Sequence, residues 1–117
     1  MKLKDGITEA LDACSIPYAL DDWAPLKPPQ RGCYATVADE MQTSGDDNLD
    51  SYYFVHSTWI ELYDEGFDEG RKKRDDLMIA LSENGVGCAR LRPEYDQSTK
   101  KFKTVYEIDE YTIKESD

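Results

Sequence analysis

Three acidic residues of this 117-residue sequence, Asp46, Asp47 and Asp50, are spaced closely enough along the chain to hold a calcium ion. An EF-hand loop starting at Asp46 needs glycine at its sixth position and glutamate at its twelfth. The sequence has Ser51 and Ser57 there. The acidic segment is therefore predicted to be the solvated tip of a hairpin and not a calcium site.

His56 is the only histidine, so any general base of the imidazole type has to be this residue. No Gly-x-Ser-x-Gly nucleophile elbow accompanies it. Cys14, Cys33 and Cys88 lie far from Cys-x-x-Cys metal spacing, and segment 85–87 lacks the third glycine of a dinucleotide-binding loop. We therefore predict no catalytic, cofactor-binding or metal-binding residues, and three reduced, partly buried thiols.

One cluster of basic side chains stands out, the run Arg71-Lys72-Lys73-Arg74. Under one interpretation it is a solvated helix face whose charges pair with the nearby acids Glu69, Asp75 and Asp76. Such pairs contribute a few tenths, about 0.2–0.5 kcal/mol, each. Under the other it is a patch that docks on an acidic neighbour, such as another copy of this chain.

The overall charge narrows the classes of partner. There are 14 Lys and Arg against 25 Asp and Glu, a formal net charge of −11. A chain this acidic repels other polyanions, so free nucleic acid is a poor ligand. The length fits one domain, 1–117. No apolar run is long enough to span a membrane and the start does not resemble a secretory signal, so no membrane partner is expected.

Hydrophobic periodicity predicts two helices. Residues 7–14 place apolar side chains on one helical stripe, with Asp5 as the expected N-cap and the end before Pro17. Residues 68–84 form the second, with Asp64 or Asp68 as its cap and Asn84-Gly85 as its stop.

The remaining segments predict strands. Residues 16–20 form a short extended piece and 21–31 a proline-rich connection. Residues 32–41 and 52–63 form a hairpin whose tip is 42–51, and 88–92 and 102–113 add two more strands. The expected fold is α+β, with a mostly antiparallel sheet of about four strands and two helices packed on one face.

Three segments together resemble a known family. Residues 25–35 are similar to a proline-rich approach to a tyrosine-containing strand. Ile60-Glu61-Leu62-Tyr63 ends a strand that an acidic turn and a charged helix follow directly, and Val105-Tyr106-Glu107-Ile108 is similar to the closing strand. Over about 100 residues the chain resembles the tail-completion or tail-terminator (head–tail joining) proteins of long-tailed bacteriophages and prophages.

The resemblance implies a non-enzymatic virion protein at the tail or head–tail junction, made in the bacterial host cytoplasm. It implies self-association into a ring, typically a hexamer, with tail-tube and head-completion proteins as further partners. DNA would pass without specific binding, because an acidic lumen repels phosphates. The expected subunit interface comprises Phe54, Trp59, Tyr63, Arg71, Lys72, Lys73 and Arg74. The expected lumen or partner loop contains Asp46, Asp47 and Asp50.

Other functions stay open at this point. The family resemblance does not separate a tail terminator from a head-closure protein. The acidity also fits a small module that mimics DNA and inhibits a basic nucleic-acid enzyme. A small enzyme is the remaining class, and no motif favours it.

Overall fold

The computed structural model describes residues 3–20, 28–29, 31–45, 52–108 and 111–113. They form two helices, α1 (Leu3–Ala13) and α2 (Phe67–Glu83). They also form seven strands, which are β1 (Tyr18–Leu20), β2 (Tyr34–Gly45), β3 (Tyr52–Asp64), β4 (Cys88–Arg90), β5 (Glu94–Asp96), β6 (Lys101–Ile108) and β7 (Tyr111–Ile113).

All seven strands belong to one sheet with the order β1-β2-β3-β6-β4, to which β5 adds beside β6 and β7 beside β3. Only β1 and β2 pair in parallel. The predicted α+β class with a mostly antiparallel sheet is confirmed. The predicted number of about four strands is too low, because the short strand β5 was not predicted and segment 102–113 divides into β6 and β7.

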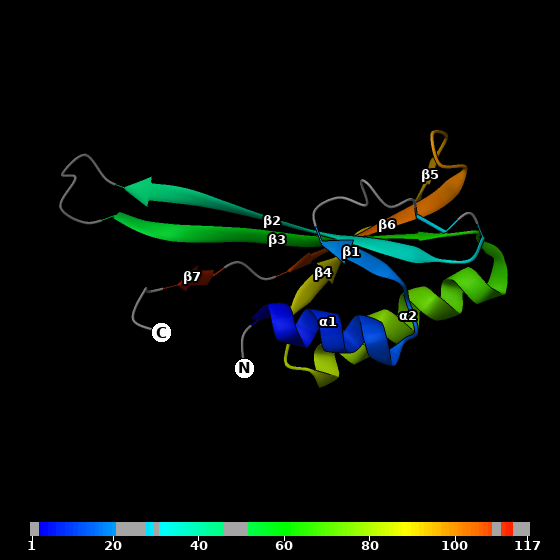
Figure 1. Ribbon diagram of the computed structural model, residues 1–117, viewed down its shortest axis with the longest axis horizontal. Coiled ribbons are helices and arrows are strands. Elements are labelled where there is room, and N and C mark those ends of the chain that lie inside the picture. The colour runs from blue at the N-terminus through cyan, green and yellow to red at the C-terminus, as the bar shows by residue number, and fades with distance from the viewer. Residues whose placement is uncertain (1–2, 21–27, 30, 46–51, 109–110, 114–117) are drawn as a thin grey trace.

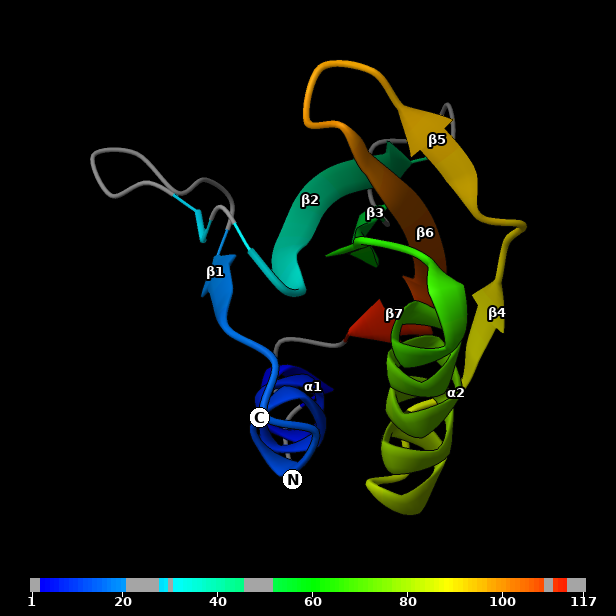
Figure 2. The same cartoon turned by 90° about the vertical axis from the view of Figure 1, so that its right-hand side faces the viewer.

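Both helices lie on the same face of the sheet (Figures 1 and 2). The core fills the space between the two layers. It is formed by Ile7, Ala10 and Leu11 of α1, Leu77, Ala80 and Leu81 of α2, and strand residues that include Val37, Ile60, Leu62 and Tyr106. Strand alternation then leaves Trp59, Glu61 and Tyr63 on the helix-free face. Neither helix, within the residues described, is long and apolar enough to cross a membrane.

The two helices end in the same way. Gly85 (φ +75°) donates to the Ser82 carbonyl, and Val86 donates to the Leu81 carbonyl. Ser15 (φ +57°) donates to Asp12 and Ile16 to Leu11 in the same pattern. This is the Schellman motif, with a left-handed residue at C′ and a buried apolar residue after it. The stop predicted at Asn84-Gly85 is confirmed.

The predicted N-caps are wrong. α1 begins at Leu3, so Asp5 lies inside the helix and not at its cap. The N-cap of α2 is Gly66, which has no side-chain cap bond. Asp64 instead accepts the backbone N–H of Gly66 at 2.7 Å. Its carboxylate also forms an ion pair with Arg74 of α2, a contact that the local sequence does not indicate.

Candidate assembly interface

The β2–β3 hairpin is the most extended feature of the molecule. Its register runs through twelve residue pairs, from Tyr34 with Tyr63 to Gly45 with Tyr52. Only the first part is flanked on both sides, by β1 up to Val37 and by β6 from Trp59 onward. The remaining residues, 39–45 of β2 and 52–58 of β3, are called the arm below. Seven pairs at about 3.4 Å each make it roughly 24 Å long.

The arm has one open edge. On its β3 side, β7 pairs with residues 54–56. On its β2 side, no strand in the described part of the chain pairs with residues 39–45. Figure 1 shows the arm extending past the helix layer. An unpaired edge of this length presents backbone donors and acceptors to another chain, so it is a surface for strand addition.

Two of the three predicted interface aromatics lie in the arm or at its base. Phe54 is in the arm, where its backbone pairs with Thr43 and Ile113, and its side chain lies outside the described part. Trp59 lies at the base of the arm, half-buried, between Ala38 and Glu107 of the neighbouring strands. Asp46, Asp47 and Asp50, the predicted loop residues, lie outside the described residues.

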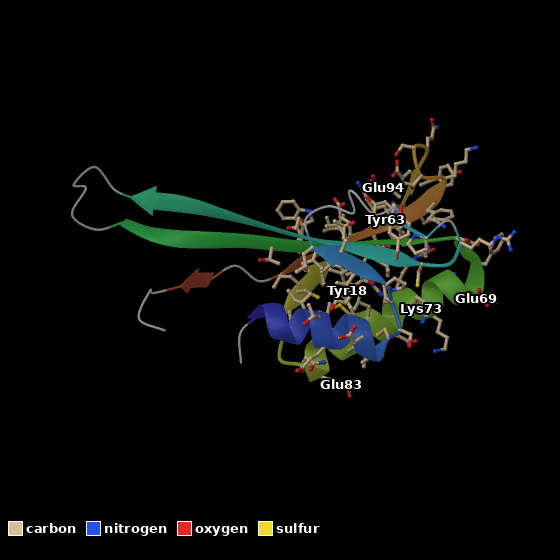
Figure 3. The ribbon with its side chains drawn as sticks, viewed as in Figure 1. Tyr18, Tyr63, Glu69, Lys73, Glu83 and Glu94 are labelled. Carbon is tan, nitrogen blue, oxygen red and sulfur yellow. The ribbon has the colours of Figure 1, made fainter. Side chains whose placement is uncertain are left out.

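Tyr63 lies at the other end of β3, on the helix-free face (Figure 3). Its ring stacks on Tyr34 with centroids 4.8 Å apart, and its hydroxyl donates to Glu61 at 3.2 Å. Burial and the adjacent Glu61 carboxylate raise the pKa of Tyr63 far above its usual value. The phenol therefore stays neutral, and Tyr63 offers an aromatic surface that the stack already holds in place.

Lys101 and Glu65 hold the start of β2 beside this stack. The Lys101 ammonium is 5.9 Å from the Tyr34 ring centroid and donates to the Gly32 carbonyl at 3.1 Å. Glu65 accepts the Gly32 N–H at 2.7 Å and lies 3.3 Å from Lys101 Nζ. These contacts join three segments distant in sequence, so this end of the hairpin is fixed while the arm extends away from it.

The four predicted cations are consecutive on α2, so they point in different directions. Arg74 pairs with the buried Asp64, and Lys73 donates to the Cys14 carbonyl at 2.6 Å, joining the two helices. Lys72 pairs with Asp76 at 2.8 Å on the surface. Arg71 is exposed. The structure thus places the cluster around the helix instead of in one patch, and Arg71 and Lys72 present the most accessible charge.

Sequence reasoning missed Phe67, the first residue of α2. Its side chain is 94% exposed and its backbone has φ +61°. Bulky residues rarely adopt this left-handed conformation. The only signal in the sequence was an aromatic residue directly after Gly66, at the boundary between strand and helix. The prediction for this boundary concerned only a capping carboxylate, Asp64 or Asp68.

The three cysteine thiols are partly buried, and the described carboxylates form no metal-binding group. Cys14, Cys33 and Cys88 are half-buried, as predicted, and form no disulfide with one another. Burial raises the pKa of Cys14 and Cys33, which disfavours their nucleophilic thiolate forms. No group of three or more His, Cys, Asp or Glu within the described ranges is arranged to hold a metal ion.

Comparison with known proteins finds a solved structure that shares this fold. No family model matches the sequence, and neither does any curated protein sequence. A chain in the solved structure of the virion of a native gene transfer agent particle superposes with a TM-score of 0.57, at 13% sequence identity. The alignment covers 94% of this chain and 90% of that chain. The two chains share a fold over nearly their whole lengths.

Proposed function

We propose that this chain is a structural protein of a phage-like particle, which assembles into a ring at the end of the tail tube as a tail terminator. Two independent lines support this: the resemblance of its sequence to tail-completion proteins and the fold shared with a chain of a gene transfer agent virion. The protein would be made in the bacterial host cytoplasm and reside at the tail or head–tail junction. It would act through packing and not through a reaction.

The observation that carries the proposal is the arm. A hairpin edge of seven residues with which no described strand pairs is an aggregation risk in a solitary protein, and it is tolerated where a partner covers the edge. One core cluster joins both helices to the sheet, which supports the proposal that the arm projects from a single domain, 1–117. An extension of that kind suits contact with an adjacent subunit.

A ring follows from the shape of such a contact. When one surface of a subunit meets a different surface of the next copy, repeated rotation either closes a ring or grows a filament. Closure as a hexamer would leave a channel for DNA. Segment 39–58 has five acidic residues and no Lys or Arg. Where it lines the channel, the duplex would stay hydrated and slide without binding.

Electron microscopy of the purified protein tests the proposal. Alone or mixed with the tail-tube protein of the same particle, it is expected to form rings in negative stain and to cap tube ends. A protein that stays monomeric at high concentration and leaves tube ends bare would overturn the proposal. Caps on isolated heads and none on tubes would assign it to head closure instead.

The distribution of charge favours the ring over the DNA-mimic alternative. A mimic needs a regular array of unpaired negative charge. In the described part of the chain, Asp64, Glu65, Asp75 and Asp76 each pair with a cation. Salt-sensitive capture of a basic nucleic-acid enzyme from host lysate, with no rings formed, would reverse this preference.

A further inference from the structure

Phe67 combines two unfavourable features at one residue. Its ring is 94% exposed to water, and its backbone is held at φ +61°. For a residue with a Cβ the left-handed region is strained, and strain of this kind persists where the surrounding structure imposes it. Glycine or asparagine would satisfy the same turn without exposing a ring. A contact outside the monomer would bury the ring and account for its presence at this turn.

Arg71 lies one helical turn after Phe67. Both side chains are exposed. Beside them, Phe102 packs edge-on against Tyr95 with centroids 5.4 Å apart, and Tyr95 is 55% exposed. A Cβ on Gly66 would meet the Phe102 ring at 2.8 Å, so the aromatic pair lies directly against the turn that carries Phe67. Together these residues form a surface of aromatic rings and one arginine, beside the acidic residues Asp68 and Glu69 of the first turn of α2.

This surface and the arm lie at opposite ends of the molecule. The longest principal axis measures 51 Å. The arm extends along that axis in one direction, and α2 begins at the other end (Figure 1), where Glu69 of its first turn is labelled in Figure 3. Two different surfaces at opposite ends are what a head-to-tail contact between identical subunits requires.

We propose that Phe67 and Arg71 form the receiving surface for the arm of a second copy of this chain. The inference rests on the proposed self-assembly and names its two contact surfaces. The chemistry of the two surfaces is complementary. In sequence, segment 39–58 has five acidic residues and no Lys or Arg, together with Tyr52, Tyr53 and Phe54. Arginine and large aromatic residues are the types that dominate binding energy at protein interfaces.

A substitution at Phe67 separates assembly from folding. Phe67→Gly relieves the left-handed strain and removes the exposed ring. The monomer should therefore unfold at a higher denaturant concentration, while the concentration needed for half-assembly rises at least about tenfold, or about 1.4 kcal/mol per contact. Phe67→Asn keeps the turn and removes the ring, and should weaken assembly equally. Ile79→Gln removes another exposed apolar side chain of α2 and should leave assembly unchanged.

A mixing experiment tests the direction of the contact. One variant carries Phe67→Asn and Arg71→Glu. The other has a shortened arm in which Asn-Gly joins Gln42 to Val55, and no residue of the core cluster falls in the deleted segment. Each variant alone should be monomeric by native mass spectrometry. Their equimolar mixture should give a one-to-one dimer and no ring, because only one productive contact remains.

The outcomes of these experiments distinguish failure of this inference from failure of the proposed function on which it rests. If wild-type protein forms rings and the Phe67→Asn, Arg71→Glu variant forms the same rings at the same concentration, the receiving surface is elsewhere. In that case the proposed function stands and this inference is overturned. If the two variants do not dimerise when mixed while wild type assembles, the head-to-tail pairing of these surfaces is likewise excluded. If wild type forms no ring alone or with tail tubes, the proposed function itself has failed.

Discussion

Arg74 donates two hydrogen bonds to the carboxylate of Asp64, from Nε to Oδ2 at 2.7 Å and from Nη2 to Oδ1 at 2.8 Å. Asp64 also accepts the Gly66 N–H, and the Arg74 carbonyl accepts the Tyr106 hydroxyl at 2.7 Å. The pair therefore joins the end of β3, the first turns of α2 and the middle of β6. It holds the turn that carries Phe67 in its left-handed conformation.

Removing one partner of this ion pair should be costly. The Asp64 side chain is 2% exposed and that of Arg74 is 16% exposed. Arg74→Met would leave a buried carboxylate without its cation, so we expect a loss of about 3 kcal/mol in the free energy of unfolding. Lys72→Met, which breaks the exposed pair with Asp76, should change it by less than about 0.5 kcal/mol. Urea denaturation compares the two. Equal effects would contradict a structural role for the buried pair.

Gly70→Ala should lower the stability of the protein, contrary to the usual effect of this substitution inside a helix. Glycine to alanine inside a helix usually stabilises by about 1 kcal/mol. A Cβ on Gly70 would come within 2.9 Å of Asp64 Cγ, so Gly70→Ala must displace the ion pair. We expect a net loss of about 1–3 kcal/mol from this overpacking. Ser82→Ala at an exposed position of the same helix should be neutral or slightly stabilising. A gain at Gly70, measured by thermal unfolding, would show that the carboxylate can move away freely.

Substitutions at Ser15 and Gly85, which stand at equivalent helix ends, should have opposite effects on the free energy of unfolding. Both residues are left-handed at C′, and only Gly85 lacks a Cβ. Ser15→Gly should raise the free energy of unfolding by about 0.5–1 kcal/mol, since relief of strain outweighs the added freedom of the unfolded chain. Gly85→Ser should lower it by a similar amount. Chemical denaturation of both variants checks the pair of signs, and two changes of the same sign would refute the equivalence.

The stability of the protein should depend on pH through the ionisation of Glu65. The Gly32 N–H, and then the Lys101 ammonium, lower the pKa of Glu65 from its ordinary value of 4.5. A carboxyl with a depressed pKa stabilises the folded state above its unfolded pKa, and the effect is lost as the pH falls through the folded pKa. Wild type should therefore exceed Glu65→Gln in stability near neutral pH and lose that advantage as the pH falls through the lowered pKa of Glu65. Glu69→Gln serves as the exposed control. A difference that persists unchanged in acid would exclude ionisation of Glu65 as its cause.

Much of the fold could be predicted from the sequence because local patterns and tertiary contacts agree. The apolar stripe of α1, the aromatic and β-branched run of β3 and the Asn84-Gly85 stop all appear in the structure. The length of the hairpin could not be predicted. Residues 42–45 have turn-forming side chains, yet they pair with β3, since cross-strand contacts outweigh a weak local preference.

The candidate site was less predictable. Four consecutive cations look equivalent in sequence, and only the fold brings Asp64 against Arg74 and leaves Arg71 exposed. Phe67 was missed because a left-handed phenylalanine contradicts every local preference that a sequence prediction uses. Conflict between local preference and structure is expected where a residue serves a contact outside its own fold.

Photo-crosslinking from position 67 tests the central claim, head-to-tail packing of identical subunits, most directly. A benzophenone amino acid replaces Phe67 in the full chain, the assembled protein is irradiated, and the linked peptides are identified by mass spectrometry. The account predicts a covalent dimer in which position 67 of one copy is joined to segment 39–58 of another. Crosslinks confined to other segments, or none in particles that are visibly assembled, would contradict it.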